Sequence, residues 1–168
     1  MTASRIISAA AALACTVAFV GCGSESGESK ATLSKQDQQQ LTERTDQFQK
    51  SLQATVTGLT SCLKDSAKSG GIAGIAACVD QLLTTTATTA EELSTYAAGL
   101  KGKVKEKCGT QLQAMSAAVK EIGSALRTAG SAIGKGDTTG FQQAIGGLSA
   151  SGGKLQAAVT AVGTDCVG

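Results

Sequence analysis

The apolar residues of this chain fall into four long stretches in which they recur at alternating steps of four and three residues. The stretches cover residues 41–62, 72–104, 112–133 and 141–166. Such steps place side chains along one face of an α-helix, so each stretch predicts a helix that packs along a partner. The chain also has no proline, the residue that most often interrupts a helix. We therefore expect an all-α protein.

The recurring residues form four apolar seams, which should meet in the core. The first seam is Leu41, Thr45, Phe48, Leu52, Thr55, Leu59 and Cys62; the second is Ile72, Ala76, Val79, Leu83, Thr86, Ala90, Leu93, Ala97, Leu100 and Val104; the third is Leu112, Met115, Val119, Ile122, Leu126, Ala129 and Ile133; the fourth is Phe141, Ile145, Leu148, Gly152, Leu155, Val159, Val162 and Cys166. Four helices joined by short loops favour an up-down-up-down four-helix bundle.

Turn-like residues set the expected helix ends. The first helix should end near Leu63, and Gly109 should act as a left-handed cap between the second and third helices. The third should end at Gly134 to Asp137. Caps and capping boxes are expected at four residue pairs, namely Ser34 with Asp37, Thr89 with Glu92, Thr110 with Gln113 and Thr139 with Gln142.

The second helix contains a local conflict. Residues Thr84 to Thr89 are mostly β-branched and poor helix formers, and the Thr89 signal lies inside the stretch. The apolar spacing nevertheless continues across this segment without a change of phase. We expect one long helix, with Thr84 to Thr89 as the place for a kink or break.

The N-terminus has the layout of an export signal. Arg5 precedes an apolar run from Ile6 to Val20, which is about 15 residues long and too short to span a membrane. The run ends in Phe19-Val20-Gly21-Cys22, which resembles the lipobox of bacterial lipoproteins. The resemblance implies that Cys22 receives a diacylglyceryl group and that cleavage occurs before it. The alternative is an ordinary secretory signal cut elsewhere, for example after Ala14.

This resemblance divides the chain into three parts. Residues 1–21 are the expected lipoprotein signal peptide, 22–32 a flexible tether rich in small polar residues, and 33–168 the helical bundle domain. The expected location is the extracytoplasmic face of the cell membrane, with the lipid on Cys22 as anchor. Asp80 interrupts the most apolar later stretch, so we expect no further membrane segment.

Six cysteines constrain the bundle further. Cys15 leaves with the signal peptide and Cys22 is taken by lipid, which leaves four in an exported chain and therefore a disulfide framework. Four cysteines allow three connectivities, and the bundle topology selects one because helices of this length separate its two ends by tens of ångströms. We expect Cys62 to pair with Cys78 and Cys108 with Cys166. A metal site is the alternative, but no CxxC pair is present.

Composition argues against several functions. There is no histidine, which removes His-based triads and most catalytic zinc sites, and there is no tryptophan for a stacking platform. Without residues 1–21 the chain loses one of its 15 basic residues and none of its 13 acidic ones, so it is nearly neutral and an unsuitable partner for nucleic acid. The adjacent carboxylates Glu91 and Glu92 face different directions on a helix. We expect no catalytic residue, metal or cofactor.

Two functions stay open. The first is a non-enzymatic interaction or structural module of the cell envelope, whose partner is an unknown envelope protein or polymer; Val56 and Leu63 are candidates for its exposed apolar face. The second is a binder of a small, lipid-like apolar ligand in a cavity between helices. The residues that would line such a cavity are Thr45, Thr55, Thr86 and Ala90. The basic cluster of Lys101, Lys103, Lys105 and Lys107 is explained by a helix C-terminus or, alternatively, by contact with anionic lipid or polymer.

Overall fold

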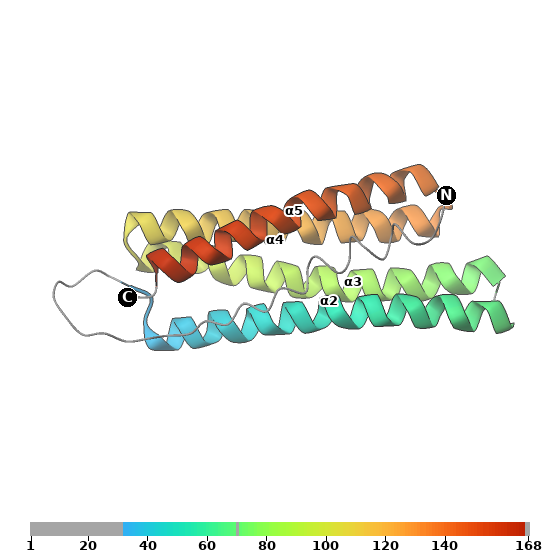
Figure 1. Ribbon diagram of the computed structural model, residues 1–168, viewed down its shortest axis with the longest axis horizontal. Helices are drawn as coiled ribbons and strands as arrows, with labels where there is room; N and C mark the ends of the chain where they lie inside the picture. Colours follow the sequence, from blue (N-terminus) through green and yellow to red (C-terminus); the bar gives the residue numbers. More distant parts are fainter. Residues whose placement is uncertain (1–31, 70, 167–168) are drawn as a thin grey trace.

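The computed structural model describes residues 32–69 and 71–166, without the side chains of residue 60 and of 63–75 in this range. It contains the α-helices α2 (Lys35–Ser69), α3 (Gly71–Leu100), α4 (Glu106–Gly134) and α5 (Thr138–Asp165). A short 3₁₀-helix, η1 (Lys101–Lys103), follows α3. The four α-helices run up and down alternately in one elongated bundle (Figure 1). The expected all-α four-helix architecture is confirmed.

Each helix packs along its neighbour in the sequence. α3 packs along α2 on one side and along α4 on the other, and α4 also packs along α5. The backbones of α2 and α5 do not pack along one another, although a fully closed bundle would bring them together. In Figure 1 these two helices lie on opposite sides of the molecule and converge toward one end. At that end the backbone N–H of Leu33 donates a 3.2 Å hydrogen bond to the carbonyl oxygen of Cys166.

The first three seams form the core as expected. Every seam residue with a described side chain is either buried or packed, partly buried, against the core. The exception is Ala76, which is partly buried but is not part of the core cluster. Close packing of small residues brings α3 and α4 together, since a Cβ added to Gly123 would lie 3.2 Å from the Cβ of Ala90. The alternation of four and three steps therefore identified the buried faces of α2, α3 and α4.

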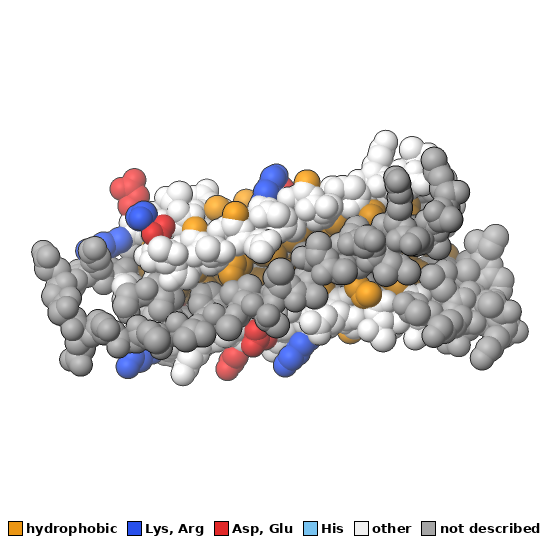
Figure 2. All heavy atoms as spheres, in the orientation of Figure 1, with side chains coloured by type: hydrophobic (Ala, Val, Ile, Leu, Met, Phe, Trp, Pro, Cys, Tyr) orange, Lys and Arg blue, Asp and Glu red, His pale blue; other side chains and the backbone are white. Residues whose placement is uncertain are grey.

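The seam of α5 is buried less completely. Ala144, Ser151 and Ala158 are buried on this helix, whereas the larger seam residues Phe141 and Leu148 are only partly buried. The larger seam residues Val159 and Val162 are buried, so burial of the α5 seam is greatest near the Cys108–Cys166 bond, where α2 and α5 converge (Figure 1). Figure 2 shows hydrophobic side chains reaching the surface between the two helix pairs.

Two expected helix boundaries are wrong. α2 continues beyond Leu63 to Ser69, and the second helix ends at Leu100, before the boundary expected at Gly109. The next helix starts at Glu106, which places Gly109 inside its first turns and not at a left-handed cap. Gly109 is buried there, and a Cβ on it would lie 3.2 Å from the carbonyl oxygen of Lys101. Close packing against η1, and not a turn, explains this glycine.

The expected turn between α4 and α5 is confirmed, and so is the first cap. Gly136 has a φ of 71°, the left-handed conformation that glycine adopts easily. Ser34 Oγ accepts a 3.1 Å hydrogen bond from the backbone N–H of Asp37 at the start of α2. α5 is capped by Asp137, whose carboxylate accepts from the N–H of Gly140, and not by Thr139.

The capping box expected at Thr110 is wrong, and Thr89, whose spacing to Glu92 resembles one, does not start a helix, since both threonines turn back to carbonyl groups of their own helices. Thr89 donates to the carbonyl of Thr86 (2.9 Å), and Thr110 donates to that of Glu106 (2.9 Å). A threonine hydroxyl inside a helix commonly makes such a bond. The sequence pattern was therefore that of helix interiors rather than helix starts.

The helix α3 is unbroken through Thr84 to Thr89. The exposed hydroxyls of Thr85 and Thr88 donate to the carbonyls of Gln81 (2.9 Å) and Thr84 (3.1 Å). Thr86 is buried and contacts α2. Tertiary packing and these local bonds therefore override the poor helix propensity of the segment, and the expected single long helix is confirmed.

Among the residues described, no helix combines the length and the apolar character needed to cross a membrane.

Candidate functional site

Two disulfide bonds tie the bundle near its opposite ends. Cys62 of α2 is bonded to Cys78 of α3, with Cα atoms 6.0 Å apart. Cys108 of α4 is bonded to Cys166 at the end of α5, with Cα atoms 5.0 Å apart. This is the connectivity that the bundle topology predicts. Cys22, the expected lipidation site, lies outside the described residues.

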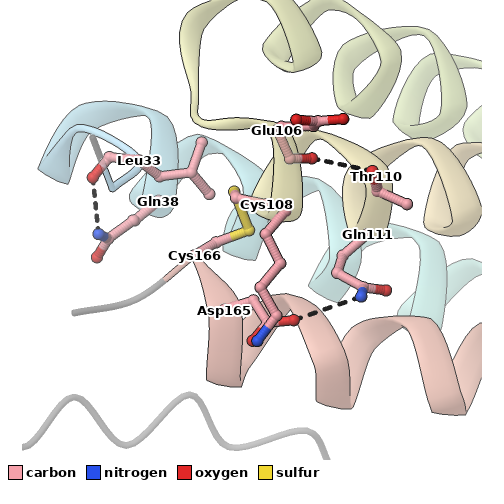
Figure 3. The surroundings of a disulfide bond; sticks show 9 residues. Leu33, Gln38, Glu106, Cys108, Thr110, Gln111, Asp165 and Cys166 are labelled. Carbon is pink, nitrogen blue, oxygen red and sulfur yellow. Dashed lines mark hydrogen bonds and ion pairs between the residues drawn. A yellow bond between two sulfur atoms is a disulfide. The ribbon is translucent and has the colours of Figure 1, made fainter. Parts of the chain in front are cut away.

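The end that carries the Cys108–Cys166 bond also fixes the start of the described chain. Gln38 donates a 2.9 Å hydrogen bond from Nε2 to the carbonyl of Leu33, whose side chain is buried (Figure 3). Gln111 of α4 donates to Asp165 of α5 at 3.3 Å. Three segments that are distant in the sequence are therefore joined here by covalent and polar bonds.

Exposed lysines cover this same end. Lys103 pairs with Asp37 at 3.6 Å, Lys107 pairs with Asp165 at 2.8 Å, and Lys101 donates a 2.6 Å hydrogen bond to Gln113. A helix C-terminus explains Lys101 and Lys103, which follow α3 and form η1. It does not explain Lys107, which lies in the first turn of α4, where the helix dipole disfavours a cation.

Asp37 belongs to a polar network that links α2 to α3. Tyr96 donates from its hydroxyl to Asp37 at 3.3 Å, and the guanidinium of Arg44 lies 4.8 Å from the centre of the Tyr96 ring. The hydrogen bond from Ser34 lowers the pKa of Asp37, with further help from Lys103. Burial of the ring, followed by the charge of Asp37, raises the pKa of Tyr96. The hydrogen bond to Asp37 orients the Tyr96 ring, and the guanidinium of Arg44 packs over this ring.

A hydrophilic hollow of about 650 Å³ lies beside this network. Its lining residues are Gln40, Glu43, Arg44 and Gln47 of α2 and Glu92 of α3. All except the partly buried Arg44 are exposed. The glutamate carboxylates accept hydrogen bonds, the Arg44 guanidinium donates them, and the glutamine amides do both. Such a lining suits a hydrophilic partner. We name this surface the α2–α3 hollow.

A second hollow of about 330 Å³ lies where α4 turns into α5. It is lined by Arg127, Thr128, Ser131, Ala132, Lys135, Asp137 and Gly140. Its two cations are partly compensated, because Arg127 pairs with Glu91 and Asp137 places its carboxylate in the wall. Asp137 also occupies the N-terminus of α5, so this helix end is already capped.

The residues expected around a ligand cavity are instead packed. Thr55 and Thr86 join their hydroxyls at 2.5 Å, and Thr45 donates to the carbonyl of Leu41 at 2.7 Å. Ala90 is fully buried against α4. None of these four residues lines either of the two hollows.

Other candidates from the sequence are separated in space. Val56 is 41% exposed on α2, while the side chain of Leu63 lies outside the described part. Glu91 and Glu92 diverge, since Glu91 pairs with Arg127 and Glu92 lines the α2–α3 hollow. Among the side chains described, no three acidic or cysteine residues are grouped as metal ligands would be. The α2–α3 hollow was not predicted from the sequence, because packing of α2 on α3 brings its lining residues together.

In comparisons with known families, curated proteins and solved structures, nothing matches this chain. Its function has to be inferred from its own residues.

Proposed function

We propose that this protein is anchored by lipid on Cys22 to the extracytoplasmic face of the cell membrane, where it is a non-enzymatic interaction or structural module of the envelope. Two features support the location. The N-terminal sequence resembles a lipoprotein signal, and two disulfides favour an oxidising compartment. Leu33, directly after the expected tether, is already buried in the bundle, so the folded domain follows the tether without a further linker.

The α2–α3 hollow is the observation that carries the interaction role. Its wall is polar, open to solvent and partly pre-organised, because Arg44 is held over Tyr96 and Tyr96 is bonded to Asp37. A surface whose groups are already positioned loses less conformational entropy when a partner binds. The partner that fits is a hydrophilic segment of an envelope protein or polymer. Glu43 and Glu92 in the wall disfavour a polyanion such as nucleic acid.

Site-specific photo-crosslinking in intact producing cells tests this role. A photoreactive residue at Gln47 in the hollow should give a discrete crosslinked product. The same residue at Gln142, an exposed glutamine on α5, is the matched control and should give none. Glu43→Ala combined with Glu92→Ala should weaken the product at Gln47. Equal products from both positions, or a product unaffected by these substitutions, would exclude the hollow as the interaction site.

The mass of the intact protein from the membrane fraction tests the anchor separately. We expect a chain that begins at Cys22 and carries a lipid-sized increment, and a gain of four protons on reduction of the two disulfides. The Cys22→Ser variant should lack the lipid increment and should no longer be found in the membrane fraction. A lipid-free chain in the soluble fraction would contradict the anchor but would leave the crosslinking result unaffected.

A second candidate, binding of a small lipid-like molecule, is favoured by one observation. The apolar seam of α5 is only partly buried, because α2 does not pack along this helix. Native mass spectrometry of protein extracted from membranes, and of a Leu148→Ser variant, tests this candidate. A bound apolar molecule that is lost in the variant would support a ligand site between the helix pairs, whereas a ligand-free protein would exclude it.

A further inference from the structure

Lys35, Lys101, Lys103, Lys105 and Lys107 are exposed together at the end of the bundle where Leu33 meets Cys166. We call this surface the lysine end. We infer that the lysine end lies against anionic lipid headgroups, so that the bundle stands on the membrane with its α2–α3 and α4–α5 loops pointing away. This inference rests on the proposed lipid anchor and adds to it the surface by which the folded domain meets the membrane.

The chain enters the bundle at the lysine end. Leu33 is fixed there by its hydrogen bonds to Cys166 and from Gln38, and by burial of its side chain. The segment from Cys22 to Leu33 is about 11 residues long and reaches at most about 40 Å when extended. The opposite end of the bundle is further away by the length of a 28–35-residue helix, about 42–52 Å. An anchored bundle therefore has its lysine end nearest the bilayer.

The charges at this end are arranged with the cations outermost. In the Lys103–Asp37 pair the lysine side chain is 62% exposed and the aspartate 19%. In the Lys107–Asp165 pair the exposed fractions are 78% and 11%. The two carboxylates therefore lie behind their lysines, and an approaching surface meets ammonium groups first. The third carboxylate of this end, that of Glu106, is exposed.

The positive charge is also local. Among the described residues, five lysines stand against three carboxylates at the lysine end, whereas acidic and basic side chains are nearly balanced elsewhere; the tether adds Glu25, Glu28 and Lys30 to the sequence before this end. On the face drawn in Figure 2, side chains of both signs lie at the end where α4 begins and near the middle of the bundle. Juxtamembrane lysines are attracted to a negatively charged leaflet, and the attraction decays within about 8–10 Å at physiological salt. The tether is long enough to permit that approach.

The location of the lysines selects lipid over a wall polymer as the occupant. A soluble or wall-bound polyanion could reach basic residues on any part of the bundle. Only the membrane surface is tied to this end by the point where the tether enters. The anionic headgroup and the anchor would then act together, since the anchor raises the effective concentration of lysines at the surface.

Lysine footprinting of the full-length protein in vesicles tests the inference. Purified protein is mixed with phosphatidylcholine vesicles, with or without about one-third phosphatidylglycerol, and acylation of each lysine is followed by peptide mass spectrometry. We expect acylation of Lys103, Lys105 and Lys107 to slow about fivefold in the anionic vesicles and to recover in about 1 M salt. Lys50, Lys120 and Lys135 should be acylated equally in both vesicles.

Two matched variants complete the design. One replaces Lys101, Lys103, Lys105 and Lys107 by Gln, and the other replaces Lys50, Lys120, Lys135 and Lys154 by Gln. The first should abolish the response to anionic lipid, measured on Lys35, and the second should retain it. The helical signal in circular dichroism checks that each variant is folded. If a variant is unfolded, the inference is tested by the footprinting of the unaltered protein alone.

The outcomes separate this inference from the anchor. Equal acylation rates in both vesicles, or protection by a soluble anionic polymer but not by vesicles, would overturn the inference even if Cys22 carries lipid. Protection confined to the lysine end would support it even if the mass of the N-terminal peptide shows no lipid. The mass of the N-terminal peptide tests the lipid on Cys22, and the footprinting does not.

Discussion

Thr55 of α2 and Thr86 of α3 bring their Oγ1 atoms within 2.5 Å of one another in the buried interface between the two helices. Ser51 extends the contact, since its Oγ lies 2.9 Å from the hydroxyl of Thr86. The three hydroxyls form a small polar cluster in a core made largely of aliphatic side chains. Directional bonds of this kind add to the aliphatic contacts in holding α2 in register with α3.

Replacement of Thr86 by Val should destabilise the protein by about 1–3 kcal/mol. The substitution keeps the shape of the side chain but removes the hydroxyl that serves Thr55 and Ser51, and buried polar atoms then lose a partner. Thr85→Val is the control, because Thr85 is exposed and bonds only within its own helix. It should change stability by less than about 0.5 kcal/mol. Urea unfolding measures both, and equal losses would show that the cluster adds nothing beyond helix propensity.

Removal of the Cys108–Cys166 bond should cost more stability than removal of the Cys62–Cys78 bond. The bonded residues are 58 and 16 positions apart, and loop-closure entropy then gives about 4 and 3 kcal/mol. The longer bridge also attaches α5, which packs along α4 but not along α2. Paired Cys→Ala variants, compared by urea unfolding, measure the two costs. A larger loss for the Cys62–Cys78 pair would contradict this ranking.

The fold was largely predictable from spacing. Leu41, Phe48 and Thr55 of α2, for example, are buried because steps of seven residues return to nearly the same face of a helix. The disulfide pairing followed as well, since antiparallel helices leave only one connectivity within bonding distance. Both inferences depend on periodicity over many residues, which is insensitive to local detail.

Helix ends and the candidate surface were less predictable. Thr110 sits two residues after Cys108 inside a helix turn, yet its spacing to Gln113 is that of a capping box. Gly109 is glycine because η1 approaches it, a tertiary contact invisible in the sequence. The α2–α3 hollow likewise depends on how Glu92 is placed opposite Glu43 on another helix. Such features arise from packing between segments rather than from local pattern.

Replacing exposed glycines of α5 by Ala should stabilise the protein. Gly146, Gly147 and Gly153 lie inside the helix, and a Cβ on any of them would meet no atom within 4 Å. Each substitution should contribute about 0.5–1 kcal/mol by lowering the entropy of the unfolded chain. Gly123→Ala is the control and should destabilise, because its Cβ would be 3.2 Å from Ala90. Thermal unfolding ranks the variants, and a loss at Gly146 would indicate a constraint on α5 that the structure does not contain.

Two carboxylates make the stability of the protein sensitive to acid. Bonds from Ser34 and Lys103 lower the pKa of Asp37 below its ordinary 3.8, and bonds from Lys154 and Ser151 lower that of Glu121 below 4.5. A depressed pKa in the folded state contributes stability that is present above the ordinary pKa and is lost as the pH falls through the folded value.

Asp37→Asn combined with Glu121→Gln should therefore lower the free energy of unfolding at pH 7 and flatten its decline between about pH 5 and pH 2. Glu121 is exposed and Asp37 is partly exposed, so the change should be modest and should shrink in high salt. Urea unfolding at a series of pH values gives the slopes. A double variant with the same acid dependence as the unaltered protein would show that neither carboxylate is stabilised by folding.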